Sequence, residues 1–485
     1  MSSFKSILKS TGLIGFFEVF RLAIGLVRNK LVAVFLGASG IGVWGLYLSF
    51  TELLQGVSSL GLEKSTVKAI AENNDDLRER DTIIKVAQFS FITFSFVCAL
   101  IGSLFSEWFS QNIFGDTEHK TGILICCLVV FLNSLTNFYK AVLNGLRQIN
   151  KLVVSQLIGV LFGNVIVVSL IPFLGIEYIP LFLLIVSITS FVPVFLYVKR
   201  NNIPYIKINF REAYKRFSFL MKIGVAFWIS GMVAMLMAYL IKVFLQKELS
   251  IEMVGVYQAS WTISNLYVGI ILTSMGVDFF PKVCASIRDK ITTNRLINDQ
   301  IEFGLLVSIP FIVGIICFAS FLLRLLYSKE FEVGASIIRW QMVGVTIRLL
   351  GFPFSYVLMA KGKGISYTIL QIGFHSLNYF LIIYLVESSG VRFLGLNYLF
   401  SYVIYLVLIS VFCYKYLNYR VSKELLKTVL VTVSLVVITL VLTYFADFIF
   451  FYFLIIIITS CYSMIQLKSK LDFDIIGFIK TKLNK

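Results

Sequence analysis

The chain has 485 residues, of which 58% are hydrophobic and only 14% are charged, and its net charge is +17. Soluble globular proteins contain roughly 45–50% apolar and about 25% charged residues, so an ordinary soluble protein is excluded. The basic residues lie mainly in short connections between apolar stretches. This pattern favours membrane orientation and contact with anionic lipids over nucleic-acid binding, and no nucleic-acid partner is expected.

The apolar stretches predict membrane-spanning helices, because a span needs about 20 mostly apolar residues. The fold class that we expect is an all-α polytopic membrane protein with about fourteen spans. They are predicted at about 12–36, 41–62, 83–105, 121–143, 152–173, 178–198, 221–245, 253–277, 303–326, 333–359, 365–386, 393–414, 425–444 and 447–467.

The first of these stretches, Gly12–Gly37, is unusual because it contains Glu18, Arg21, Arg28 and Lys30. One charge near the bilayer centre costs roughly 2.5–3.5 kcal/mol on insertion scales. Arg21 and Arg28 are two helical turns apart and share a face, and Glu18 lies one turn before Arg21. We interpret this face as lining a wet, anion-accepting cavity. In the alternative interpretation, Glu18 neutralises Arg21 while Arg28 and Lys30 extend to the interface.

A repeat is suggested at the six-helix period, as is common in transporters. The second span contains Gly45-Leu46-Tyr47, and the eighth contains Gly255-Val256-Tyr257. Lys30 precedes the first of these tyrosines by 17 residues, and Lys242 precedes the second by 15. We therefore predict two pseudo-symmetric six-helix lobes at 1–198 and 223–414, a basic cytoplasmic linker at 199–222, and two extra transmembrane helices with a basic tail at 415–485.

Further charges lie inside the later spans. Lys242 either extends to the interface or faces a cavity, and Arg348, near the middle of its span, is preferred to Arg339 as a cavity residue. Glu52 is a candidate carrier of a proton or cation, or a charge balance for Arg28. Asp278 is a coupling candidate or the cap of a helix end. Seven cations against two or three acids within the spans favour an anionic substrate.

The orientation follows from the distribution of Lys and Arg. If the N-terminus is cytoplasmic, 32 of the 43 basic residues lie in inward connections or at the span ends that adjoin them, and only four lie in outward connections. The positive-inside rule then places both termini in the cytoplasm. The outward connections are short, and the longest is Ser106–Lys120.

The sequence contains no pattern typical of an enzyme or a cofactor site. The seven Cys form no C-x-x-C pair, the two His are isolated, and neither a P-loop nor an H-E-x-x-H motif occurs. We therefore expect no metal, no cofactor and no enzymatic activity. The energy for transport would come from an ion gradient, the membrane potential or substrate consumption.

The stretches GLVRNKLVAVFLGASGIGVWGLY and VGVYQASWTISNLYVGIILTSMGVDFFPKV resemble the polysaccharide exporters, or Wzx-type O-antigen translocases, of the multidrug/oligosaccharidyl-lipid/polysaccharide flippase superfamily. The resemblance covers essentially the whole chain. It implies alternating access between two six-helix lobes in the bacterial inner membrane. It also implies flipping of undecaprenyl-diphosphate-linked oligosaccharide to the outer leaflet, with Arg21, Arg28 and Lys30 at the diphosphate.

The remaining site assignments are inferences from the residues. Lys242 and Arg348 are further candidates for the diphosphate, and Trp44, Tyr47, Tyr257 and Trp261 are candidate cavity aromatics. A polysaccharide polymerase or other assembly protein is a candidate partner. The rivals are a cation-coupled multidrug exporter, which would need acidic cavity residues, a peptidoglycan-precursor flippase, and a membrane-embedded glycan polymerase, which would need a larger outer loop.

Overall fold

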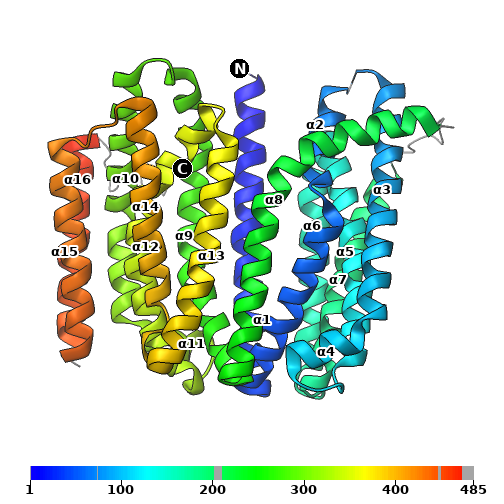
Figure 1. Cartoon of the computed structure of the whole chain (residues 1–485), viewed down its shortest axis with the longest axis horizontal. Coiled ribbons are helices and arrows are strands. Elements are labelled where there is room, and N and C mark those ends of the chain that lie inside the picture. Colours follow the sequence, from blue (N-terminus) through cyan, green and yellow to red (C-terminus); the bar gives the residue numbers. More distant parts are fainter. Residues whose placement is uncertain (1, 74, 201–209, 446–448, 472–485) are drawn as a thin grey trace. The chain divides into compact units, whose positions relative to one another are not determined.

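The structure, a computed structural model, describes residues 2–73, 75–200, 210–445 and 449–471 (Figure 1). The side chains of residues 2–19 and of a few later helical positions, Asp278 among them, lie outside this description. All regular structure in the described ranges is helical. The predicted all-α polytopic fold is confirmed.

The first ten helical elements run from the N-terminus to the middle of the chain. They are α1 (Ser2–Ser59), α2 (Leu62–Glu72), α3 (Leu77–Leu104), α4 (Ser106–Phe114), α5 (Lys120–Gly145), α6 (Ile149–Leu170), η1 (Ile176–Tyr178), α7 (Ile179–Lys199), α8 (Phe210–Glu248) and α9 (Ile251–Ser286).

The remaining elements follow in the second half of the chain. They are α10 (Lys290–Cys317), α11 (Ala319–Leu326), η2 (Lys329–Gly334), α12 (Ala335–Ala360), α13 (Gly364–Ser389), η3 (Gly390–Phe393), α14 (Leu396–Leu417), α15 (Lys423–Phe445) and α16 (Ile449–Leu471).

Each of the fourteen predicted spans overlaps a helix, and the ninth, 303–326, is divided between α10 and α11. The first two both lie in α1, which is interrupted at Gly37, where φ is 68° and ψ is −166°. Only glycine adopts such a backbone without strain, and the chain turns back there, so that α2, which follows α1, lies toward the same end as the start of α1 (Figure 1). Within the described ranges, eleven helices are long and apolar enough to cross a membrane, with both parts of α1 included in one of them.

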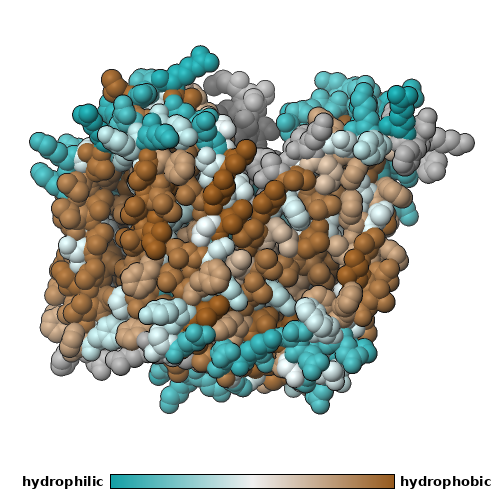
Figure 2. Space-filling model, viewed as in Figure 1, coloured by the Kyte–Doolittle hydropathy of each residue, from teal (hydrophilic) through white to brown (hydrophobic). Residues whose placement is uncertain are grey.

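The surface agrees with this interpretation. Hydrophobic residues cover the middle of the helices on the face shown in Figure 2, and hydrophilic residues gather at the helix ends. Exposed aromatic and aliphatic side chains along the helices include Phe89, Phe96 and Val407. An apolar belt of this kind is stable only against lipid, since soluble monomers rarely expose large contiguous apolar patches.

The chain folds into two compact units. The first unit contains residues 1–258 together with Leu326–Ser328, and the second contains 259–325 and 329–485. The helix α8 therefore belongs to the first unit, although the six-helix period assigns its sequence to the second lobe. The lobes predicted at 1–198 and 223–414 come from a repeat in the sequence, and their pseudo-symmetry remains a prediction.

The prediction that the eighth span ends near Asp278 is wrong. The interpretation of Asp278 as a cap required the eighth span to end beside Pro281, but α9 continues through Pro281 to Ser286. Proline removes one backbone donor and disfavours a helix interior, yet membrane helices tolerate it where the freed carbonyl is satisfied locally. Asp278 therefore lies inside a helix, and its side chain is outside the described residues.

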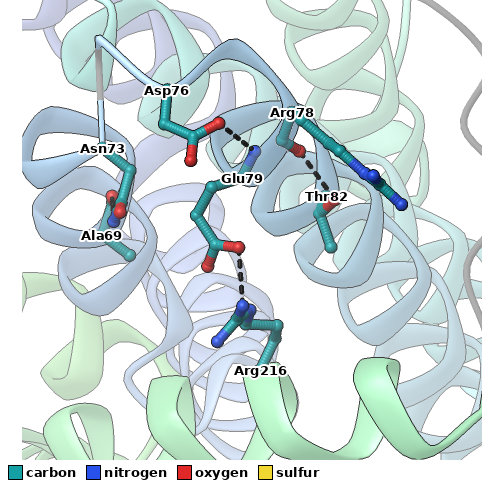
Figure 3. Close-up of polar contacts among 7 residues, drawn as sticks. All are labelled: Ala69, Asn73, Asp76, Arg78, Glu79, Thr82 and Arg216. Atoms are coloured by element: carbon teal, nitrogen blue, oxygen red, sulfur yellow. Dashed lines mark hydrogen bonds and ion pairs between the residues drawn. The ribbon is translucent and has the colours of Figure 1, made fainter.

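A polar junction joins α3 and α8 in the first unit, as Figure 3 shows. The carboxylate of Asp76 accepts a hydrogen bond from the backbone N–H of Glu79 at 3.1 Å and so caps the N-terminus of α3. The side chain of Glu79 then forms an ion pair with Arg216 of α8 at 2.6 Å. The junction fixes the N-terminal part of α8 to the N-terminal end of α3.

Candidate functional site

In the first unit, Arg28 lies half-buried on α1 and faces an aromatic ring. Its guanidinium carbon is 4.5 Å from the centroid of the Trp44 ring, a cation–π geometry. Its Nε and Nη2 atoms both donate to the Oδ1 atom of Asn29, at 3.3 and 3.0 Å. No carboxylate pairs with Arg28 in the described part of the chain. The two-nitrogen edge of the guanidinium is thus held by one neutral oxygen.

The neighbouring cation, Lys30, is fixed by a distant part of the chain. Its Nζ atom donates to the backbone carbonyl of Tyr327, which is 297 residues later in the sequence. Tyr327 is fully buried, and its hydroxyl accepts a hydrogen bond from the Nδ2 atom of Asn29 at 3.5 Å. Arg28, Asn29 and Lys30 therefore share one anchor, the segment Leu326–Ser328 that packs with the first unit.

Lys242 of α8 also lies in the first unit. Its side chain is only 7% exposed and donates to the carbonyl of Gly45 at 3.2 Å. It also interacts electrostatically with the carboxylate of Glu52, which lies two turns further along α1. The alternative in which Lys242 extends to the interface does not fit a side chain buried to this degree. Glu52 acts here as a charge balance for Lys242.

In the second unit, Arg348 lies near the middle of α12. Its Nη1 atom donates to the Oδ1 atom of Asn265 at 3.2 Å and to the hydroxyl of Tyr398 at 3.1 Å. Its guanidinium carbon lies 5.7 Å from the centroid of the Tyr402 ring. Arg339, on the same helix, instead donates to the carbonyl of Ile316 and lies near Tyr444. The two arginines are nine residues apart, which places them on opposite faces of α12, and they contact different helices.

The remaining charged candidates are Arg21, Glu18 and Asp278. Arg21 is exposed on α1. Glu18 and Asp278 lie outside the described residues, so the predicted pairing of Glu18 with Arg21 stays a prediction. Arg28, Lys30 and Lys242 belong to the first unit, whereas Arg348 belongs to the second.

The candidate aromatic residues are mostly occupied by protein contacts. Trp44, Tyr47 and Tyr257 are each at most 5% exposed. Tyr47 packs on Phe114 at 4.8 Å between ring centroids. Trp261 meets Tyr398 edge-on at 5.5 Å. Trp44 supports Arg28, and Trp261 supports the tyrosine that holds Arg348.

The hydroxyl of Tyr47 also reaches a histidine at the start of α5. It lies 2.9 Å from the Nδ1 atom of His119, and the His119 ring stacks on Phe114. Burial lowers the pKa of His119, although the nearby carboxylates of Asp116 and Glu118 oppose the shift. A neutral imidazole is thereby favoured at this end of the first unit.

Sequence reasoning missed the residues that hold the candidate cations. Asn29 carried a weak signal, because it stands between Arg28 and Lys30. Tyr327, Asn265 and Tyr398 carried none, because their contacts join segments that are distant in the chain.

Comparison with known proteins reveals several relatives. The chain is 23% identical over 393 residues to the lipid III flippase of Escherichia coli (strain K12), covering 79% of this chain and 92% of the relative. It is 23% identical over 341 residues to a putative O-antigen transporter of Shigella flexneri, covering 68% and 78% of the two chains.

Solved structures show the same fold. The lipid II flippase MurJ in an inward closed conformation matches with a TM-score of 0.75 at 16% identity, over 94% of this chain and 99% of that one. An inward-facing multidrug resistance MATE family transporter of the MOP superfamily matches with a TM-score of 0.67 at 14% identity, over 85% and 99%.

The family match is broad. Residues 31–335 match the family described as polysaccharide biosynthesis protein, which is more than half of the chain. The matched region includes α8, α9 and the second part of α1. The resemblance to polysaccharide flippases in the sequence is confirmed, and this multi-pass membrane protein belongs to the polysaccharide biosynthesis protein family.

Proposed function

We propose that the protein is a flippase that moves undecaprenyl-diphosphate-linked oligosaccharide repeat units from the cytoplasmic to the outer leaflet of the bacterial inner membrane. The units would belong to O-antigen or a similar surface polysaccharide. Support comes from the family match, and from relatives named as a lipid III flippase and a putative O-antigen transporter.

The observation that carries the proposal is the arrangement of Arg28. A guanidinium that presents two nitrogens to one oxygen has the fork geometry suited to a phosphate or carboxylate. In this protein the fork is occupied by the neutral amide oxygen of Asn29. A diphosphate oxygen that replaces this amide would add a charge-assisted hydrogen bond, and Trp44 would keep the guanidinium in position.

Lys30 and Lys242 provide two more cations in the same unit. Lys30 donates a hydrogen bond to the backbone carbonyl of Tyr327 and lies two residues from Arg28 on α1. Lys242 interacts electrostatically with the carboxylate of Glu52. We assign the diphosphate to Arg28 and Lys30 first, with Arg21 and Lys242 as secondary contacts and Glu52 as the group that a coupling proton or cation would titrate.

Transport would proceed by alternating access, in which the two lobes change their relative orientation while the bound diphosphate stays on these cations. Both termini would lie in the cytoplasm. The diphosphate loses its hydration when it leaves the headgroup region, and in-membrane cations would offset that cost.

The test is export of surface polysaccharide in cells that depend on this gene. Arg28→Ala removes the fork, and we expect export to fall about 10- to 100-fold, because a hydrogen bond to a charged group contributes about 1.5–3 kcal/mol. Arg28→Lys keeps the charge without the fork and should retain part of the activity. Arg324→Ala is the matched control, since Arg324 is exposed and pairs with Glu332.

Protein abundance in the membrane is measured alongside each variant. Normal export by Arg28→Ala at normal abundance contradicts the assignment of Arg28. Death of cells on loss of the gene would instead indicate a peptidoglycan precursor as substrate.

A multidrug exporter is the second candidate, because a MATE transporter shares the fold. This function requires cavity acids for cationic drugs. Glu52 is the cavity acid proposed from the sequence whose side chain is described, and it interacts electrostatically with Lys242. Changed drug susceptibility with intact surface polysaccharide after gene deletion would favour this function.

A further inference from the structure

The second unit contains a cavity of about 250 Å³ that the proposed diphosphate contacts do not use. It lies among α12, α13 and α14, and Arg348, Tyr356, Tyr367, Gln371, His375 and Tyr402 are among its lining residues. Arg348 is near the middle of α12, while Met359, another lining residue, is next to its last residue. The cavity therefore extends along the helices from the middle of the membrane toward the Lys361–Lys363 connection.

The charge of the cavity is positive. Arg348 is the cation among the lining residues, and none of them is Asp or Glu. In the described part of the chain, Arg348 forms no ion pair, and its Nε and Nη2 atoms have no hydrogen-bond partner. Its Nη1 atom is held by Asn265 and Tyr398, so the guanidinium is fixed in position while its Nε and Nη2 atoms stay unused. A buried cation with unused donors and no nearby acid favours an oxyanion.

The walls combine aromatic rings with polar groups. Tyr402 lies 4.6 Å from Tyr398 and 4.4 Å from Phe374 between ring centroids, which fixes its orientation. The hydroxyl of Tyr405 is hydrogen-bonded to Ser355 at 3.1 Å and to Gln371 at 3.2 Å. Apolar ring faces next to hydroxyl and amide groups suit a ligand with one face of C–H bonds and a rim of hydroxyls. A lipid tail would leave the Nε and Nη2 atoms of the Arg348 guanidinium without partners.

We propose that this cavity binds a single acidic sugar residue of the transported glycan, with its oxyanion on Arg348 and its ring against the tyrosines. Small-molecule sites usually measure about 300–1,000 Å³, so a cavity of about 250 Å³ admits one ring rather than an oligosaccharide. The inference rests on the proposed function, since it names the class of glycan that the flippase accepts. The same guanidinium chemistry would also bind the diphosphate of the lipid, and the experiment separates these two sources.

The experiment measures binding of three probes to the purified full-length protein in detergent by isothermal titration calorimetry. The probes are methyl β-glucuronide, methyl β-glucoside and inorganic pyrophosphate. We expect the glucuronide to bind at least 10-fold more tightly than the glucoside, because the two differ only in the carboxylate. Arg348→Gln should abolish this difference, and Arg348→Lys should reduce it. Arg339→Gln, on the same helix but outside the cavity, should preserve it.

Two results would overturn the proposal. One is equal binding of the glucuronide and the glucoside to the unmodified protein, a comparison that does not depend on whether a variant folds. The other is pyrophosphate binding that is lost in Arg348→Gln while the two sugars stay indistinguishable, which would assign Arg348 to the diphosphate. Failure of the proposed function would appear separately, as intact surface polysaccharide after deletion of the gene, because the binding experiment does not require transport.

Discussion

Gly42 of α1 and Gly255 of α9 let two helix backbones of the first unit cross in close contact. A Cβ atom at Gly42 would lie 2.0 Å from the carbonyl oxygen of Ile251, and one at Gly255 would lie 2.1 Å from that of Ala38. Backbone cannot move aside as a flexible side chain can. Both glycines fall in the segments whose sequence pattern suggested a repeat.

We expect Gly42→Ala to destabilise the protein by about 1–3 kcal/mol, the usual cost of overpacking. The measurement is thermal unfolding of the purified protein in detergent. Gly25→Ala is the control on the same helix, because a Cβ atom at Gly25 meets no atom within 4 Å. Equal melting temperatures for the two variants would contradict the close crossing of α1 and α9.

The polar contacts of α15 allow a second test on single residues. Thr428 donates a hydrogen bond to the buried carboxylate of Glu302 at 2.6 Å. Thr432, one turn later, is fully buried, and its hydroxyl has no hydrogen-bond partner in the described ranges. The two threonines thus share a helix and a degree of burial but differ in bonding.

We expect Thr428→Val to destabilise the protein by about 1–3 kcal/mol, because a buried carboxylate loses one donor. Thr432→Val should be neutral or stabilising, because it removes a buried polar group that is unsatisfied. Thermal unfolding of both variants checks the difference. A larger loss for Thr432→Val than for Thr428→Val would show that the bond to Glu302 is unimportant.

At the scale of elements, the ion pair between Arg216 and Glu79 attaches the N-terminal part of α8 to the N-terminal end of α3. Both side chains are less than a third exposed, at 28% and 20%. The pair Lys68–Glu72 on α2 offers a contrast, because its atoms are 3.7 Å apart and its side chains are 55% and 51% exposed. Exposed pairs contribute little, while partly buried pairs with good geometry contribute more.

We expect a double-mutant cycle of Glu79→Gln and Arg216→Gln to give a coupling free energy on the order of 1 kcal/mol. The same cycle with Lys68→Gln and Glu72→Gln should give about 0.3 kcal/mol or less. The readout is thermal stability in detergent. A coupling for the first pair as small as that of the second would mean that α8 is held by its apolar contacts alone.

The helices α15 and α16 form the appended pair that the span count predicted. Both pack against α10. The hydroxyl of Ser463 on α16 donates to the carbonyl of Leu306 at 2.6 Å, and Thr428 on α15 bonds to Glu302. These polar contacts attach the pair to one particular helix of the second unit, because lipid would satisfy neither group.

For the whole molecule, the uneven distribution of basic residues predicts the topology. The connection at Lys247 between α8 and α9 is expected outside, and the connection at Arg288 between α9 and α10 is expected in the cytoplasm. Alkaline phosphatase fused after Leu249 should be active, and the same enzyme fused after Arg288 should be inactive. A fluorescent protein at the C-terminus should fluoresce, since it folds only in the cytoplasm. The reverse pattern at these sites would invert the orientation.

The sequence by itself determined the class, the spans and the family of this protein. Hydrophobic length is a local property, so every predicted span overlaps a helix, and Gly37 marks the break in α1 because only glycine tolerates that backbone. The charged residues of the first span also identified Arg28 and Lys30 as unusual. Local signals failed at Pro281, because one proline does not end α9, which continues to Ser286.

Only the tertiary structure decided what these cations contact. Lys30 meets the carbonyl of Tyr327, and Arg348 meets Asn265 and Tyr398, all from distant parts of the chain. It also placed α8 with the first unit. The physical reason is that side-chain partners depend on which helix faces are brought together, and a periodic apolar sequence specifies that a helix spans the membrane without specifying its neighbours.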